Sequence, residues 1–119
     1  MLPLVYPLLN VAPAVTALIG SPPRVYRHGS APQNVLKPYV TWSVPGGEVQ
    51  NSFEGACVDV FRVQVDCWSD GDAEVETLAE AVRAAIEPAA HLIAYLADER
   101  DPVTQRFRIS FSFDFIASR

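Results

Sequence analysis

The sequence has little positive charge. It contains nine lysines and arginines, with Lys37 the only lysine, against fourteen aspartates and glutamates, and its formal net charge is −5. Proteins that hold nucleic acid by its phosphates need a face rich in lysine and arginine, because much of their affinity comes from counterion release. The composition therefore argues against direct, tight DNA binding, but it is compatible with DNA that passes close by.

Cysteine and histidine are also scarce. Cys57 and Cys67 lie ten positions apart, and no Cys-x-x-Cys or Cys/His spacing typical of a zinc site is present. We interpret them as reduced, half-buried thiols rather than as a disulfide or half of a metal site. His28 and His91 lie near no serine or cysteine in a nucleophile motif, so we assign them incidental surface or capping roles. The sequence predicts no catalytic residue, no metal site and no cofactor, and hence no enzyme.

The first 19 residues are apolar, but they lack the features of a signal peptide or a membrane span. No lysine or arginine precedes Arg24, and prolines occur at positions 3, 7 and 13. Leu8, Val11, Val15 and the pair at 18–19 follow helical spacing. Because proline is disfavoured inside a helix, the pattern predicts two short helical pieces, with Pro13 opening the second and Gly20 ending it.

Strands are expected next, at residues 24–26 and 38–43, followed by a polar excursion at 44–55 that forms a loop or an extended projecting hairpin. Residues 59–68 alternate, with apolar side chains from Phe61 to Cys67 on one face and polar ones on the other. A helix opens after Ser69, which fits a capping box with Asp72 loosely. Its apolar stripe consists of Val75, Leu78, Ala79, Val82 and Ile86, and Pro88 ends it.

A strand is expected at 91–97, a turn at 98–102 and a long strand from Phe107 to Phe115, where apolar residues recur at period two. The chain is thus predicted to be one α+β domain, 1–119, of order α-β-β-β-α-β-β. It would consist of an antiparallel sheet of four to five strands with two helices packed on one face. The exposed edges of such a sheet need cover, for which partner subunits are the natural candidates.

Candidate contact residues lie on two segments. Trp68 falls on the polar face of its strand, with Arg62 and Gln64, and we expect these three at contacts between subunits. The 44–55 excursion is expected to dock, through Pro45, Glu48, Gln50, Asn51 and Phe53. The aromatic residues are expected in the core and at interfaces rather than as a stacking platform for single-stranded nucleic acid, because no basic residues interleave with them.

Three blocks in order resemble the phage tail-completion family. The first consists of the runs RVY at 24–26, APQ at 31–33 and PYVTW at 38–42. The second is VQVDCW at 63–68 followed by the helical run LAEAVR at 78–83, and the third is DPVT at 101–104 followed by the strand 106–115. Each block alone is weak, but together at fitting spacing they are fairly specific.

The resemblance implies a fold like that of lambdoid tail terminators, assembled as a hexameric ring at the head-proximal end of a long tail tube. Such a ring would stop tube polymerisation and offer a surface to the head-tail connector protein, with DNA passing through the lumen. It would form in the host cytoplasm and bind the tail tube protein. The alternatives are a head-tail connector or minor tail subunit and, in a different class, a small ligand-binding or regulatory α+β module of the host.

Overall fold

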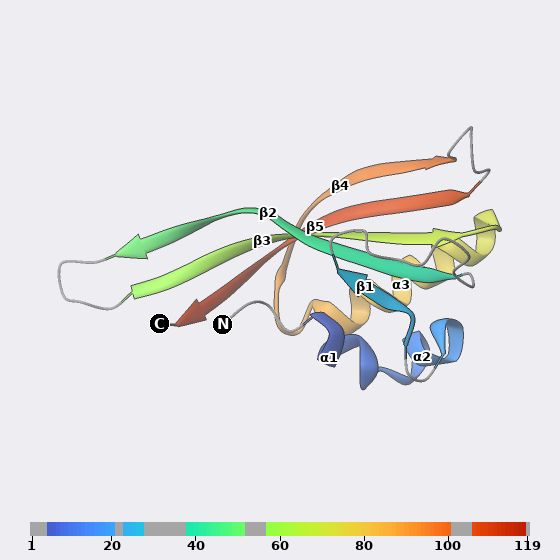
Figure 1. Ribbon diagram of the computed structural model, residues 1–119, viewed down its shortest axis with the longest axis horizontal. Coiled ribbons are helices and arrows are strands. Elements are labelled where there is room, and N and C mark those ends of the chain that lie inside the picture. The colour runs from blue at the N-terminus through green and yellow to red at the C-terminus, as the bar shows by residue number, and fades with distance from the viewer. Residues whose placement is uncertain (1–4, 21–22, 28–37, 52–56, 101–105, 119) are drawn as a thin grey trace.

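The computed structural model describes residues 5–20, 23–27, 38–51, 57–100 and 106–118, with the backbone alone for 45–51, 57–59, 97–98 and 116–118. Its elements are, in order, α1 (Val5–Asn10), α2 (Pro13–Ile19), β1 (Val25–Arg27), β2 (Tyr39–Asn51), β3 (Cys57–Ser69), α3 (Asp72–Ile86), β4 (His91–Arg100) and β5 (Phe107–Ser118). The five strands form one sheet in the order β1-β2-β3-β5-β4, and the three helices lie on one face of it (Figure 1). The α+β class and the helices on one face are as predicted.

The sheet is mixed rather than wholly antiparallel, because β1 pairs with β2 in parallel, Val25 opposite Val40. The other three pairs are antiparallel. A parallel pair needs a connection of about a dozen residues to return the chain to the same end. The eleven residues between Arg27 and Tyr39 are enough for that return. The alternation of apolar and polar residues within a strand does not indicate whether its neighbour runs parallel or antiparallel. The sequence therefore could not reveal the parallel pairing of β1.

The core lies between the sheet and the helices. All five apolar stripe residues of α3 are buried, and on β3 the alternate residues Val63, Val65 and Cys67 are buried too. Phe111 and Phe113 of β5 are buried with their rings edge to face, 5.2 Å between centroids. Burying one such side chain contributes about 1.5–3 kcal/mol, so this layer dominates the stability of the domain. The periodicities of α3 and β3 are confirmed. On β5 the apolar residues from Ile109 to Phe115 are buried as predicted, but Ser110 and Ser112 on the other face are buried as well.

The N-terminal segment forms two helical pieces, as predicted, with Pro13 as the first residue of α2. Gly20 caps α2 with φ 88°, in the left-handed region that favours glycine, and its amide donates to the Thr16 carbonyl at 2.9 Å. The predicted apolar stripe was wrong at Val11, whose side chain is 74% exposed. Val11 lies in the turn between the two helices, where Pro13 interrupts the helical period.

Helix α3 starts differently from the predicted capping box. Its N-cap residue is Gly71, and Ser69 is a buried residue at the end of β3. The Ser69 hydroxyl accepts from the Gly71 amide at 3.1 Å and donates to the carboxylate of Glu74, not of Asp72. The serine therefore stabilises the strand-to-helix connection from beneath the helix end.

The polar excursion is an extended hairpin, since β2 runs to Asn51 and β3 begins at Cys57. Residues 46–51 of β2, 57–61 of β3 and 115–118 of β5 pair in register and reach beyond the helices, to the left in Figure 1. We call this three-stranded part the sheet extension. A register shift in β2 between Ser43 and Gly46 marks where it leaves the body of the sheet.

Strand β4 is longer than predicted, and the turn expected at 98–102 was wrong for its first three residues. Asp98, Glu99 and Arg100 pair with β5. The Glu99 carboxylate accepts from Arg108 at 2.6 Å, and the Arg100 guanidinium lies 5.4 Å from the centre of the Phe107 ring. Charged residues read as a turn in the sequence, but these cross-strand contacts keep them in the ladder. The longest described helix, α3, has 15 residues, and no helix in the described ranges has the length and apolarity to cross a membrane.

Candidate assembly surfaces

The face of the sheet that carries no helix, here the outer face, holds the three predicted subunit-contact residues. Arg62, Gln64 and Trp68 alternate along β3 with residues buried against the helices, so all three lie on this face. Arg62 is exposed, while Gln64 and Trp68 are partly buried by their neighbours in adjacent strands. The predicted set thus lies along β3, the central strand of the sheet, with Asp66 between Gln64 and Trp68 on the same face.

Trp68 is held by three contacts. It faces Tyr39 in the register of β2 and β3, and the two rings stack with centroids 6.0 Å apart at 7°. Its indole Nε1 donates to Thr41 Oγ1 at 3.0 Å. From β5, the Arg108 guanidinium lies 5.6 Å from the centre of the indole ring. A stacked pair and a cation–π contact each contribute about 0.5–1.5 kcal/mol, so the indole presents a fixed surface.

Tyr39 is enclosed in a similar way. Arg106 lies 5.8 Å from its ring and donates from Nη1 to its hydroxyl at 2.9 Å, while Tyr26 meets the ring edge-on at 6.3 Å. Tyr39, Trp68, Arg106 and Arg108 form what we call the aromatic–arginine cluster. The expectation that no basic residues interleave with the aromatic ones was wrong here. Arg108 belongs to β5, forty residues after Trp68, which it faces in the strand register, and Arg106 lies just before β5. Only this pairing of distant strands brings the arginines to the aromatic rings.

A polar row adjoins this cluster. Arg62 donates to both carboxylate oxygens of Asp114, at 3.1 and 3.3 Å, and Gln64 donates to Asp66 at 3.3 Å. The Arg62 side chain is 56% exposed, so water screens the pair and its stabilisation is about 1 kcal/mol at most. This row is therefore better suited to orienting polar groups for a partner than to stabilising the fold.

The outer margin of β4 is apolar and exposed. Ile93, Tyr95 and Leu96 have 49%, 58% and 52% of their surface exposed. Register shifts between β4 and β5 occur at Leu92/Ala94 and Tyr95/Ala97, so Ile93 and Leu96 are the extra residues of two bulges. Sequence reasoning missed this surface. The available signal was that consecutive residues of β4, and not only alternate ones, are apolar.

The predicted docking residues lie apart from the row on β3. Glu48, Gln50 and Asn51 belong to the β2 part of the sheet extension, opposite Val60, Val58 and Cys57. Pro45 lies within the register shift of β2, and Phe53 lies outside the described residues. Arg62 links the two sets, because it pairs with Gly46 at the start of the extension.

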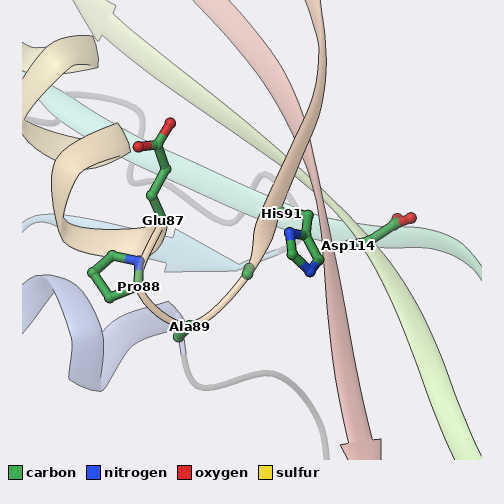
Figure 2. A pocket seen from close by; sticks show the side chains of 6 residues that line it. Glu87, Pro88, Ala89, His91 and Asp114 are labelled. Carbon is green, nitrogen blue, oxygen red and sulfur yellow. The ribbon is translucent and has the colours of Figure 1, made fainter.

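One hollow, of about 160 Å³, lies between the end of α3 and the start of β4 (Figure 2). Its lining comprises Glu87, Pro88, Ala89, Ala90, His91 and Asp114. The lining contains no serine or cysteine nucleophile, and the Asp114 carboxylate points away from the His91 ring toward Arg62. In the described ranges no three His, Cys, Asp or Glu residues gather as metal ligands. The hollow offers no arrangement for catalysis, and His28 lies outside the described residues.

Cys67 is fully buried rather than half-buried. Burial raises the pKa of its thiol far above the ordinary value, and the Asp66 carboxylate raises it further. Such a thiol stays protonated and unreactive at neutral pH. Cys67 is therefore a core residue of the sheet and not a functional nucleophile.

Comparison with known proteins was made at the levels of family, sequence and structure. The model of the family "Tail completion protein gp17" matches residues 3–118. No curated protein matches the sequence. Among solved structures, the chain is similar to a chain of one described as "Virion of native gene transfer agent (GTA) particle", with a TM-score of 0.67 and 22% identity over 97% of this chain and 92% of that one. At this identity the structural likeness shows the fold.

Proposed function

The chain belongs to the tail completion protein family, whose members are structural proteins of phage tails, and from this membership we propose that it closes the head-proximal end of the tail tube of a long-tailed phage. There it ends the addition of tube subunits and offers the surface that the head-tail connector protein binds. The observation that carries the proposal is the family match over residues 3–118, nearly the whole chain. The same extent supports a single functional unit, residues 1–119.

In this proposal the protein acts by binding alone, with no catalytic residue and no cofactor. The outer face and the β4 margin support this role, because aromatic and arginine side chains fixed in place are typical of protein interfaces. We assign Arg62, Gln64 and Trp68 to contacts between subunits. Residues 44–55, with Glu48 and Gln50 on β2, are assigned to contact with the tail tube protein.

The proposed assembly is a hexameric ring, formed in the host cytoplasm and kept in the virion, with DNA passing through its lumen. The formal net charge of −5 is consistent with this passage, because a ring that does not bind phosphates lets DNA slide. The family match favours this virion role over that of a host ligand-binding module.

Particles assembled without this protein test the proposal. We expect overlong tails of variable length by electron microscopy, because nothing stops tube growth. Filled heads without tails, beside tubes of normal length, would assign the chain to the connector instead. Adding the purified protein to growing tubes in vitro should stop elongation within the mixing time, and tubes that continue to grow would contradict the proposal.

A further inference from the structure

Within the described residues, the large apolar side chains that are exposed occur in two places. Three of them, Ile93, Tyr95 and Leu96, form the β4 margin. The other two are Tyr6 of α1, 39% exposed, and Val11 in the turn after it, 74% exposed. In Figure 1 β4 lies at the top and α1 and α2 at the bottom, so the two places do not meet within one copy. Exposed apolar side chains that gather in this way mark sites of protein contact.

The first place is the outward surface of α1 and α2. Residues 5–20 contain no charged side chain, and Asn10 is the one polar residue among their exposed positions. The exposed apolar residues, which we call the N-terminal patch, are Tyr6, Pro7, Val11, Pro13, Ala14 and Ala17. A surface helix normally carries charged or polar residues on the side away from the core. Two consecutive helices without any charge therefore favour a partner that covers them.

The second place is open because the helix layer ends before β4. Helix α3 packs on β3 and β5, and α1 and α2 pack against α3. Tyr95 faces the helix side, since it pairs with the buried Phe111, and yet it is 58% exposed. The register shifts at Ile93 and Leu96 are bulges, which hinder the addition of another strand. The β4 margin is therefore suited to packing through its side chains.

The side of α3 that borders the β4 margin is acidic. Arg83 marks this side, because it donates from Nη1 to the Tyr95 hydroxyl at 2.9 Å. Residues three or four positions apart are neighbours on a helix surface. Glu80 and Glu87 are such neighbours of Arg83, Glu76 lies four positions before Glu80, and all three are exposed. Arg83 is paired with Glu87, so the border keeps a net negative charge.

The acidic border distinguishes among the surfaces that another copy could bring to it. The first acidic residue of the chain is Glu48, so α1, α2 and β1 contain none, and Arg24 and Arg27 lie in or beside β1. The outer face, in contrast, carries Asp66 and Asp114 on β3 and β5, and α3 carries its own carboxylates. Like charges brought together at an interface oppose binding. The N-terminal patch meets an apolar margin with an acidic border without this cost.

We propose that the N-terminal patch of one copy packs against the β4 margin of the next copy and the side of α3 that borders it. The neighbour's helix layer is thereby extended beyond α3, over the strand that its own helices leave open. The contact joins two different surfaces, so it repeats head to tail and forms a ring when its rotation closes. The inference rests on the proposed ring and specifies two surfaces that hold it together.

Charge placed at Val11 tests the N-terminal patch. Val11→Glu brings a carboxylate to the acidic border, and the matched control Val11→Lys brings the opposite charge to the same exposed position. By light scattering and native mass spectrometry, alone and with tail tubes, Val11→Glu should need a concentration higher than the wild type by roughly a hundredfold. Val11→Lys should need at most roughly tenfold more. Equal effects of the two charges, or none, with both variants folded by circular dichroism, overturn the inference.

A mixture of two variants identifies the partner surface. Val11→Glu blocks the N-terminal patch, Ile93→Glu/Leu96→Glu blocks the β4 margin, and each protein keeps the surface that the other has lost. With tags of different mass, under conditions in which the wild type assembles, each variant alone should be a monomer by native mass spectrometry. Their mixture should contain a dimer of one copy of each and nothing larger. A dimer of Val11→Glu alone would show two β4 margins in contact, and the absence of a mixed dimer would equally refute the pairing.

These results separate the inference from the function on which it rests. If the wild type forms rings and caps tubes but the variants do so equally well, the contact is wrong and the proposed function stands. If the wild type stays monomeric even with tail tubes, and tube length is unaffected, the proposed function fails and the inference fails with it.

Discussion

At the scale of single residues, the structure separates side chains that stabilise the fold from those that are available to a partner. Cys67 and Trp68 are neighbours on β3 and point to opposite faces. Cys67 is fully buried under the helices, while Trp68 lies on the outer face between Tyr39 and Arg108. Alternation along one strand therefore assigns adjacent residues to the core and to a candidate interface.

The Cys67 thiol should be unreactive in the native protein. Its raised pKa and complete burial leave neither thiolate nor access for a maleimide or a disulfide reagent. In a Cys57→Ser variant, we expect no modification by mass spectrometry at pH 8 over hours, and complete modification in concentrated urea. Rapid native modification would contradict the described burial.

The raised pKa of the Cys67 thiol also predicts that the stability of the fold depends on pH. A thiol with a raised folded pKa stabilises the fold fully below its unfolded pKa of 9.0 and progressively less as the pH rises above it. From that pH upward, the free energy of unfolding should fall by up to about 1.4 kcal/mol per pH unit through Cys67. Urea titrations at several pH values should show a shallower fall for Cys67→Ala. Parallel curves for the two proteins would refute the assignment.

Replacing Trp68 by phenylalanine tests its place in the aromatic–arginine cluster. The change keeps an aromatic ring but removes the indole Nε1 donor, so Thr41 loses its hydrogen bond. We expect a loss of about 0.5–1.5 kcal/mol in the free energy of unfolding, measured by urea denaturation. Since Trp42 is on the other face, Trp68→Phe should leave its buried fluorescence in place. An unchanged midpoint would show that the hydrogen bond contributes nothing to stability.

At the scale of elements, helix α3 contributes the largest continuous apolar surface from a single helix. Leu78→Ala removes a fully buried side chain facing the sheet and should lower the free energy of unfolding by about 2–5 kcal/mol. The control Val11→Ala, in the exposed turn after α1, should change it by at most about 0.5 kcal/mol. Denaturant midpoints measure both, and a cost below 1 kcal/mol for Leu78→Ala would argue against the packing of α3 on the sheet.

Elements with a local signal could be predicted from the sequence. The stripe of α3 and the alternation in β3 and β5 each lie within one segment, and proline and glycine placed the breaks of the N-terminal helices. Two failures are local, at Val11 and at the capping box of α3, and the others depend on pairing between distant segments. The parallel direction of β1, the continuation of β4 through Glu99 and the bulge at Ile93 follow from strand register, which local periodicity does not encode.

The same distinction applies to the candidate surfaces: some of their residues could be predicted from local alternation, and others only from the pairing of distant strands. Arg62, Gln64 and Trp68 could be placed on a polar strand face from alternation alone. Arg106 and Arg108 were visible as polar residues of the last strand, but their position over Tyr39 and Trp68 needed the order β2-β3-β5. The apolar margin of β4 becomes a surface only when β4 is known to end the sheet.

At the scale of the whole molecule, the separation of charge makes association depend on salt in a defined direction. Residues 70–87 contain six acidic residues against one arginine and supply α3, which packs on β3 and β5, whereas Arg24 and Arg27 lie in or beside β1 at one end of the strand order. Attraction between exposed charges falls as the Debye length shortens from about 10 Å at 0.1 M salt to about 3 Å at 1 M. Association driven only by apolar burial would not weaken as the salt concentration rises. Salts such as sulfate would strengthen such an association.

We therefore expect assembly of the purified protein to weaken, and its association rate to fall, as sodium chloride rises from about 0.05 M to about 0.5 M. Light scattering measures the assembled fraction and stopped-flow mixing the rate. Glu76→Gln/Glu80→Gln removes two exposed charges from α3 without touching its buried face, and should flatten the salt dependence. If assembly instead strengthens with salt in both proteins, the opposite charges of the two segments play no part and apolar burial drives the association alone.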